Sequence, residues 1–291
     1  MTRYAKPHTV TDALALLAER PWRLLAGGTD FYPAQGNRPV AEPVLDINGL
    51  AELRAITTTT THLIIGARTT WGDIAASRTL PPAFAALKQA AREVGSVQIQ
   101  NAGTVGGNLC NASPAADGVP ALMILEAEVE LASQGATRVL PLSEFILGNR
   151  RTALAPDELV TAIRIPTRAT AGASSFVKLG ARRYLVISVA MAAARVALRN
   201  GVVEDCAISV GACSEVAMRF PALEKSLVGR SAQGGLRQHV DPCYFEALQP
   251  IDDVRGSGDF RRKASCEIVS RALAAACSAA QAQQRSGLGA A

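Results

Sequence analysis

The sequence predicts an α+β protein whose two regions are joined by a short polar segment. Helical and extended patterns alternate from Val10 to Ile165, and residues 167–175 are then mostly small and polar, which marks a boundary. Three extended segments follow, and Asn200-Gly201 between the last two is a strong hairpin signal. A chain of 291 residues, of which 48% are hydrophobic, is long enough for two or three modest domains.

The first 55 residues predict a small α/β unit. Thr9-Val-Thr-Asp12 is a capping sequence for an amphipathic helix at Val10–Glu19, and Pro21 ends that helix. Trp22–Ala26 is typical of a buried strand, and it leads directly into Gly27-Gly28. A second strand is expected at Val44–Ile47.

The middle region, residues 56–170, opens with a hairpin around a threonine-rich turn and ends at Pro166. We expect a glycine-containing loop over residues 95–118. The elements expected around that loop are strands at Leu53–Thr58 and His62–Ala67, helices at Trp71–Ser77 and Pro81–Val94, a helix at Val119–Glu126, and strands at Val129–Ala132 and Leu159–Ile165.

The C-terminal region predicts three antiparallel strands followed by helices. The strands are expected at Ser175–Leu179, Ile187–Leu198 and Val202–Val210, and the helices at Pro221–Leu227 and Phe260–Ala280. Residues 281–291 are rich in Gln, Ser, Gly and Ala, so we expect a flexible tail.

Charge and cysteine usage exclude several classes of function. The net charge is +5, but the basic residues are scattered, so no nucleic-acid partner is expected. The six cysteines form no C-x-x-C pair, which argues against a metal site and favours reduced thiols in the cytoplasm. The apolar stretch Leu185–Leu198 is too short for a membrane span, which needs about 20 residues.

Candidates for catalysis are scarce. His8, His62 and His239 each stand alone, and the sequence contains no H-E-x-x-H, G-x-S-x-G or P-loop motif. No G-x-G-x-x-G follows a strand, which argues against a Rossmann site. We therefore assign no catalytic residue to this chain.

Two glycine-rich loops are the strongest chemical signal. The first is Ala26-Gly27-Gly28-Thr29-Asp30, and the second is Asn101–Pro114, which contains Gly106-Gly107. Paired glycines let the backbone approach a ligand closely and aim consecutive N–H groups at an anion. The hydroxyls of Thr29, Thr104 and Ser113 could add donors, so the two loops could clamp a pyrophosphate. Ordinary turns are the alternative, and the spacing alone does not identify a nucleotide.

Several segments resemble the FAD-binding part of the xanthine dehydrogenase family of molybdenum hydroxylases, which includes the medium subunits of aerobic carbon monoxide dehydrogenase. The second loop with the Ser-Pro-x-x-Asp that follows it is the most specific part. The resemblance covers nearly the whole chain and rests on Leu24–Asp30, Gln98–Asp117, Glu158–Pro166, Phe176–Arg183 and Asp252–Arg262.

The resemblance implies a fold and a set of cofactor-binding residues. It implies a two-part FAD-binding fold of the PCMH/vanillyl-alcohol-oxidase type over residues 1–170, with parts 1–55 and 56–170. A small α+β C-terminal domain with a three-stranded antiparallel sheet would follow over 171–280. Asp117 would lie near the isoalloxazine, Val160 would pack on the ring, and Lys178 would reach the flavin. The residues implied to hold the pyrophosphate and ribitol are Ala26, Gly27, Gly28, Thr29, Asp30, Thr104, Val105, Gly106, Gly107 and Asn108.

The resemblance also implies a task within a larger enzyme. FAD would be bound non-covalently and would pass electrons from [2Fe-2S] clusters in a small subunit to a terminal acceptor. Substrate would be oxidised on a large molybdopterin subunit, within a dimer of heterotrimers. Residues 118–170 contain no cysteine, so this chain should hold no iron–sulfur cluster of its own. The alternatives are a flavin-free assembly subunit and a stand-alone flavin oxidase, which would need a base near the flavin.

Overall fold

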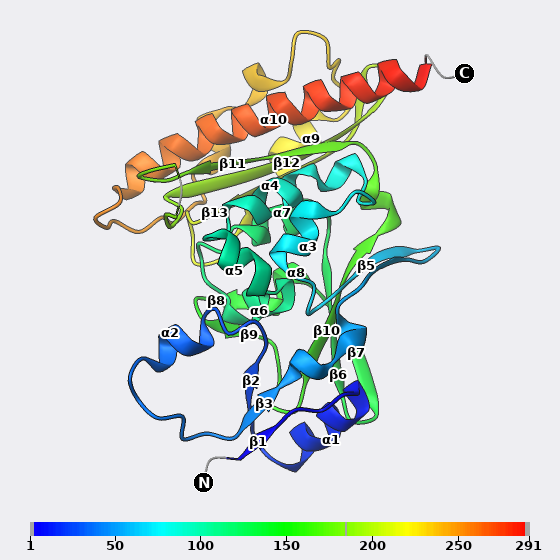
Figure 1. Cartoon of the computed structure of the whole chain (residues 1–291). Coiled ribbons are helices and arrows are strands. Elements are labelled where there is room, and N and C mark those ends of the chain that lie inside the picture. Colours follow the sequence, from blue (N-terminus) through cyan, green and yellow to red (C-terminus); the bar gives the residue numbers. More distant parts are fainter. Residues whose placement is uncertain (1–2, 184, 289–291) are drawn as a thin grey trace.

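A computed structural model describes residues 3–183 and 185–288 of the chain (Figure 1). Helices and strands are mixed, as the sequence predicts. The N-terminal unit lies at one end of the molecule and the C-terminal sheet with its long helix at the other, and a group of short helices lies between them (Figure 1).

The N-terminal unit is a parallel sheet with the order β1-β3-β2. Its helix α1 (Val10–Glu19) begins where the Thr9 side chain accepts a hydrogen bond from the amide of Asp12, as the capping sequence predicts. The chain leaves β2 through the first glycine loop into a short helix, α2. The remaining bounds are β1 (Tyr4–Ala5), β2 (Arg23–Leu25), α2 (Phe31–Gln35) and β3 (Val44–Asp46).

The middle region is built on an antiparallel sheet with the order β4-β5-β10-β6-β7. The predicted strands are present, but the edge strand β7 was missed because most of its side chains are exposed and show no apolar alternation. The small hairpin β8–β9 was also missed. The strands are β4 (Ile56–Thr58), β5 (His62–Gly66), β6 (Glu128–Ser133), β7 (Ala136–Pro141), β8 (Ile146–Gly148), β9 (Arg151–Thr152) and β10 (Leu159–Pro166).

Six short helices pack between this sheet and the C-terminal sheet or flank them. The prediction of a single loop over 95–118 was wrong, because that segment contains α5 and α6. Ser96 and Thr104 cap the two helices, and Val105 and Leu109 are buried, so packing overrides the low helix propensity of Gly106-Gly107. The helices are α3 (Trp71–Ala76), α4 (Ala85–Glu93), α5 (Val97–Ala102), α6 (Val105–Asn111), α7 (Gly118–Met123) and α8 (Leu142–Phe145).

The C-terminal sheet is antiparallel, with the order β11-β12-β13-β14. The three long strands were predicted, and β14 is a short fourth strand that was not. Asn200 and Gly201 form the hairpin turn with φ of 52° and 75°, the left-handed geometry this pair favours. The bounds are β11 (Ala173–Leu179), β12 (Ala190–Arg199), β13 (Val202–Gly211) and β14 (Met218–Arg219).

Both faces of this sheet are buried. Ala192 and Ala194 pack with Val269 of the long helix α10 (Gly258–Leu288), whereas Met191 and Ala193 belong to the core of the middle region. Successive side chains point to opposite faces of a strand, so one apolar run serves two cores. The sheet therefore lies between α10 on one side and α4 and α7 on the other (Figure 1).

The two predicted C-terminal helices are present, but the tail prediction was wrong over residues 281–288. The first is α9 (Pro221–Leu227), and the second, α10, continues through residues 281–288 instead of ending at Ala280. The side-chain Nε2 atoms of Gln281 and Gln284 donate to the carbonyls of Ala232, at 2.7 Å, and of Leu198 in β12, at 2.9 Å, which holds this last part of the helix in place. Residues 289–291 lie outside the described part of the chain.

Candidate functional site

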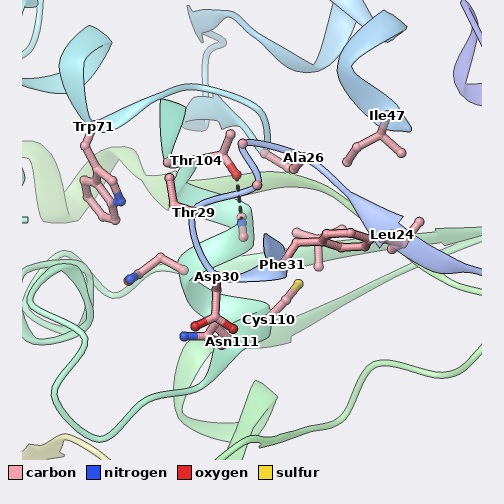
Figure 2. Close-up of a pocket in the computed structure, with 18 of the residues that line it drawn as sticks. Leu24, Ala26, Thr29, Asp30, Phe31, Ile47, Trp71, Thr104, Cys110 and Asn111 are labelled. Carbon is pink, nitrogen blue, oxygen red and sulfur yellow. Dashed lines mark hydrogen bonds between the residues drawn. The ribbon is translucent and has the colours of Figure 1, made fainter. Parts of the chain in front are cut away.

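A cavity of about 320 Å³ lies where the two glycine loops meet, between the N-terminal unit and the middle region. It falls within the size range of small-molecule and cofactor sites. Figure 2 shows its walls, with the first loop crossing the centre of the view. Of the predicted residues, those that line it are Ala26, Gly27, Gly28, Thr29, Asp30, Thr104, Gly106, Gly107, Asn108 and Val160.

Glycine in the first loop lets the two loops touch. A Cβ built on Gly27 would lie 1.8 Å from the carbonyl oxygen of Ala102, at the end of α5. The next residue, Gly28, has φ +74°, which is unfavourable for any residue with a side chain. Contact between the loops thus explains the glycine at residue 27, and backbone conformation explains the glycine at residue 28.

The first loop also presents free backbone donors. Among the described residues, the amides from Gly27 to Phe31 donate no hydrogen bond to any protein acceptor. Four of the five residues are half-buried and Asp30 is exposed, so their amides can bond to water or to a ligand. These consecutive N–H groups are therefore available to an anion bound in the cavity.

The amides of the second loop are used differently. The amides of Val105 and Gly106 donate to the carbonyls of Thr69 and Ala67, both at 2.9 Å. The amide of Gly107 donates to Thr104 Oγ1 at 3.0 Å, the cap of α6 that Figure 2 draws. The second loop therefore supplies shape and side chains to the cavity rather than a row of free amides.

Gly106 and Gly107 have different roles. A Cβ on Gly106 would lie 2.8 Å from both Cβ and O of Ala67, so this glycine is needed for packing. Gly107 is exposed, and a Cβ there would meet only Thr104 Oγ1, at 2.8 Å. A side chain at Gly107 would therefore enter the ligand space, and Thr104 Oγ1, the cap of α6, is the neighbour that would have to shift.

Apolar side chains that the sequence analysis missed form the two ends of the cavity. Trp71 lies on one side of the first loop, and Leu24, Phe31 and Ile47 lie on the other (Figure 2). Trp71 is only 1% exposed. The sequence predicts strands that contain Leu24 and Ile47 and a helix that begins at Trp71, but it gives no prediction for Phe31 and no sign that these residues share a cavity. Only the fold brings them together.

Asn108 contributes a buried acceptor. Its Oδ1 has no hydrogen-bond partner among the described residues. A buried polar atom that lacks a partner costs about 1–3 kcal/mol, so a ligand donor at this point would be favourable.

Two apolar ends, a central row of free amides and the Asn108 acceptor are the features that a dinucleotide such as FAD requires, and the residues fit that cofactor.

The cavity offers little acid–base chemistry. Its ionisable lining residues, within the described chain, are Arg23, Asp30 and Cys110. Arg150 holds the Asp30 carboxylate at 3.0 Å, and burial raises the pKa of the Cys110 thiol to about 12. No histidine lines the cavity among the residues described. The site can bind and shield a cofactor, but it presents no poised base.

Four predicted site residues lie outside the cavity wall. Val105 is fully buried in the core, and Ser113 Oγ accepts the amide of Ala115 at 3.3 Å. Asp117 and Lys178 are brought together instead: Lys178 Nζ lies 2.7 Å from Asp117 Oδ2. Burial raises the pKa of Asp117, and the charge and hydrogen bond of Lys178 oppose this.

The described residues contain no group of three or more His, Cys, Asp or Glu that could hold a metal ion. Across residues 3–183 and 185–288, no helix has the length and apolar character needed to cross a membrane.

Two family models match the chain. Residues 1–168 match the FAD binding domain in molybdopterin dehydrogenase, and residues 175–276 match the CO dehydrogenase flavoprotein C-terminal domain. The two matches lie on either side of the segment at 169–174, and the first contains both glycine loops.

Individual proteins show the same similarity. The chain is 36% identical to the nicotinate dehydrogenase FAD-subunit of Eubacterium barkeri, over 77% of this chain and 78% of that one. It is 30% identical to the glyceraldehyde dehydrogenase medium chain of Sulfolobus acidocaldarius, over 89% and 92%. A structure of carbon monoxide dehydrogenase from Hydrogenophaga pseudoflava, which lacks the Mo-pyranopterin moiety of the molybdenum cofactor, matches with a TM-score of 0.85, at 28% identity over 97% of each chain.

Proposed function

The chain belongs to the family of FAD-binding subunits of the molybdopterin dehydrogenases, and we propose that it binds FAD in the cavity between its glycine loops and transfers electrons within a multi-subunit oxidoreductase. The observation that carries this proposal is the row of free amides from Gly27 to Phe31 at the centre of a two-ended apolar cavity. The fold class and the recognition made from sequence are confirmed by the family matches and by the likeness to carbon monoxide dehydrogenase.

The residues of the first loop would hold the pyrophosphate. Anions bind favourably where consecutive backbone N–H groups converge, and Gly27 and Gly28 leave that space open. Thr29 and Asn108 could bond further cofactor oxygens and hydroxyls from the two sides. Ser113, Asp117 and Lys178 stay sequence predictions as direct cofactor contacts.

The apolar ends of the cavity would take the ring systems of the dinucleotide. Leu24, Phe31 and Ile47 lie at one end and Trp71 at the other, and Val160 also lines the cavity. These apolar side chains would exclude water and contact the flat rings. When bound, FAD supplies the capacity to accept electrons one at a time and to pass them on.

The partners are part of the same proposal. We propose that substrate is oxidised on a large molybdopterin subunit and that electrons reach this chain from [2Fe-2S] clusters of a small subunit. The names of its relatives, a FAD-subunit of nicotinate dehydrogenase and a medium chain of glyceraldehyde dehydrogenase, support this division.

Three finer predictions accompany this proposal. A dimer of heterotrimers follows the prevalence of two-fold symmetry among oligomers. A cytoplasmic location fits six free cysteines. The division into residues 1–170, with parts 1–55 and 56–170, and 171–280 is supported by the ranges of the two family matches.

A titration tests the binding step. Addition of FAD to the purified, flavin-stripped chain should quench flavin fluorescence with a stoichiometry of one per chain. A chain that folds but does not bind FAD would favour the flavin-free assembly subunit. A chain that binds FAD and oxidises substrate without partners would favour the stand-alone oxidase, although no histidine among the described residues lines the cavity to serve as a base.

A further inference from the structure

Helix α7 begins at a buried ion pair with the C-terminal sheet. Its first residue, Gly118, follows Asp117, whose carboxylate accepts from Lys178 Nζ at 2.7 Å and from Ser188 Oγ at 2.6 Å. The side chains of Lys178 and Asp117 are 9% and 8% exposed. Lys178 lies on β11 and Ser188 precedes β12, so both partners of Asp117 come from beyond the polar boundary segment.

The other end of α7 is held by the same sheet. Arg219 Nη1 donates to the carbonyl of Met123 at 2.9 Å, and Arg195 Nε donates to the carbonyl of Ile124 at 3.0 Å. The last carbonyls of a helix have no partner within the helix, and cations there match the helix dipole. The C-terminal sheet therefore fixes α7 at both ends.

The start of α7 is also in direct contact with the wall of the FAD cavity. A Cβ on Gly118 would lie 2.2 Å from Cη2 and 2.9 Å from Cζ2 of Trp71, so the indole ring rests on the backbone of α7. The backbone amide of Trp71 donates to the carbonyl of Gly103, in the second glycine loop, at 3.1 Å. Trp71 is thus held between α7 and that loop.

We propose that Lys178 and Asp117 are a positioning pair, through which the C-terminal sheet fixes α7 and, by way of Gly118 and Trp71, sets the wall of the FAD cavity. The inference rests on the proposed function for its ligand, but the geometry it describes is a property of the chain itself. The pair acts through Trp71 and needs no contact with the cofactor. Removing one partner leaves the other charge buried and unpaired, which is strongly unfavourable.

Two readouts test the pair at temperatures well below the unfolding midpoint. The chain has two tryptophans, so Trp71 is the only one left in a Trp22→Phe background, and quenching of its fluorescence by acrylamide reports its exposure. FAD affinity is measured by flavin fluorescence. In Lys178→Met we expect stronger quenching of Trp71 and about tenfold weaker FAD binding, which corresponds to about 1.4 kcal/mol. In Lys178→Arg, which keeps a cation at this position, Trp71 quenching and FAD affinity should both return most of the way to the values of the unsubstituted chain.

Gly118→Ala is a second variant that leaves the ion pair intact. Alanine is a better helix former than glycine, so a purely local effect would stabilise α7. We expect instead that the new Cβ displaces Trp71 and weakens FAD binding as Lys178→Met does. If Lys178→Met does not fold, Gly118→Ala decides: unchanged Trp71 quenching and unchanged FAD affinity in this variant would overturn the proposal.

A matched control separates positioning from stability. Arg164 pairs with Glu130 at 3.1 Å on the five-stranded sheet and lines no part of the cavity. Arg164→Met should lower the unfolding midpoint and leave FAD affinity and Trp71 quenching unchanged. The proposal is overturned if Lys178→Met behaves as this control does. If the unsubstituted chain binds no FAD, the proposed function fails, while the quenching of Trp71 still tests the pair.

Discussion

Gly27 and Ala102 lie so close together that a Cβ on Gly27 would be 1.8 Å from the Ala102 carbonyl oxygen. This contact joins the first glycine loop to the N-terminal part of the second. The atom in the way is backbone, so a flexible side chain cannot move aside to relieve the overlap. The first loop can reach its position only with glycine at residue 27.

Gly27→Ala should therefore damage the fold as well as the site. We expect a loss of about 1–3 kcal/mol in the free energy of unfolding, the scale of overpacking in a dense interior, together with weaker FAD binding. Chemical denaturation and flavin titration measure the two effects. A variant with unchanged stability would show that the loops do not touch as described.

Gly107→Val should separate binding from folding. Its Cβ would meet only Thr104 Oγ1, and the larger side chain would project into the ligand space. We expect a folded protein with about tenfold or weaker FAD affinity, a change of at least about 1.4 kcal/mol. Ala282→Val, at an exposed position of α10, is the matched control and should bind FAD normally. Equal affinity in the two variants would remove the second loop from the binding site.

FAD should be released by acid precipitation. Covalent attachment through a thiol requires the thiolate, and burial raises the pKa of Cys110 to about 12, which leaves the thiol protonated at neutral pH. Absorbance of the supernatant and of the redissolved pellet measures the distribution. A yellow pellet after denaturation would contradict the expectation, and Cys110→Ser would then identify the linkage.

The start of α3 should make stability depend on pH in the acid range. Hydrogen bonds from Arg54 to the Asp73 carboxylate, with the Thr70 capping bonds, lower the pKa of Asp73 to about 2. The unfolded chain therefore binds this proton first as the pH falls. The contribution of Asp73 to the free energy of unfolding is fully present above its ordinary pKa near 4. It is lost as the pH falls through the pKa of about 2 that Asp73 has in the folded chain. Thermal unfolding midpoints should show a gap between the unsubstituted chain and Asp73→Asn at pH 5 that closes towards pH 2. A gap that stays constant would mean that Asp73 is not held by Arg54 in this way.

The sequence predicted those elements whose pattern is local. The helix at Val10–Glu19 and the Asn200-Gly201 hairpin follow from a cap, an apolar period and a turn pair, and both are present. The edge strand β7 was missed because exposed strands lack an apolar period. The helix α6 was missed because Gly106-Gly107 disfavour a helix that tertiary packing then stabilises, whereas α5 has only six residues and none of them is buried, so it shows no apolar period.

The site was predicted in part for the same reason. The glycine loops are contiguous in sequence and could be identified, but the apolar ends of the cavity are not. Leu24 and Trp71 carry no local sign that they share a wall. The contact between Asp117 and Lys178 spans 61 residues, and each side chain alone is an ordinary surface or capping residue. Only the packing of β11 against α4, and of β12 and β13 against α7, brings them together.

Reconstitution of the complex tests the central claim most directly. The purified chain with FAD should show no oxidation of an aldehyde or N-heterocycle, because we propose that substrate is oxidised on the molybdopterin subunit. Addition of the iron–sulfur and molybdopterin subunits should restore turnover, with bleaching of the flavin absorbance after substrate is added anaerobically. Substrate oxidation by the isolated chain, free of molybdenum and iron, would contradict the account.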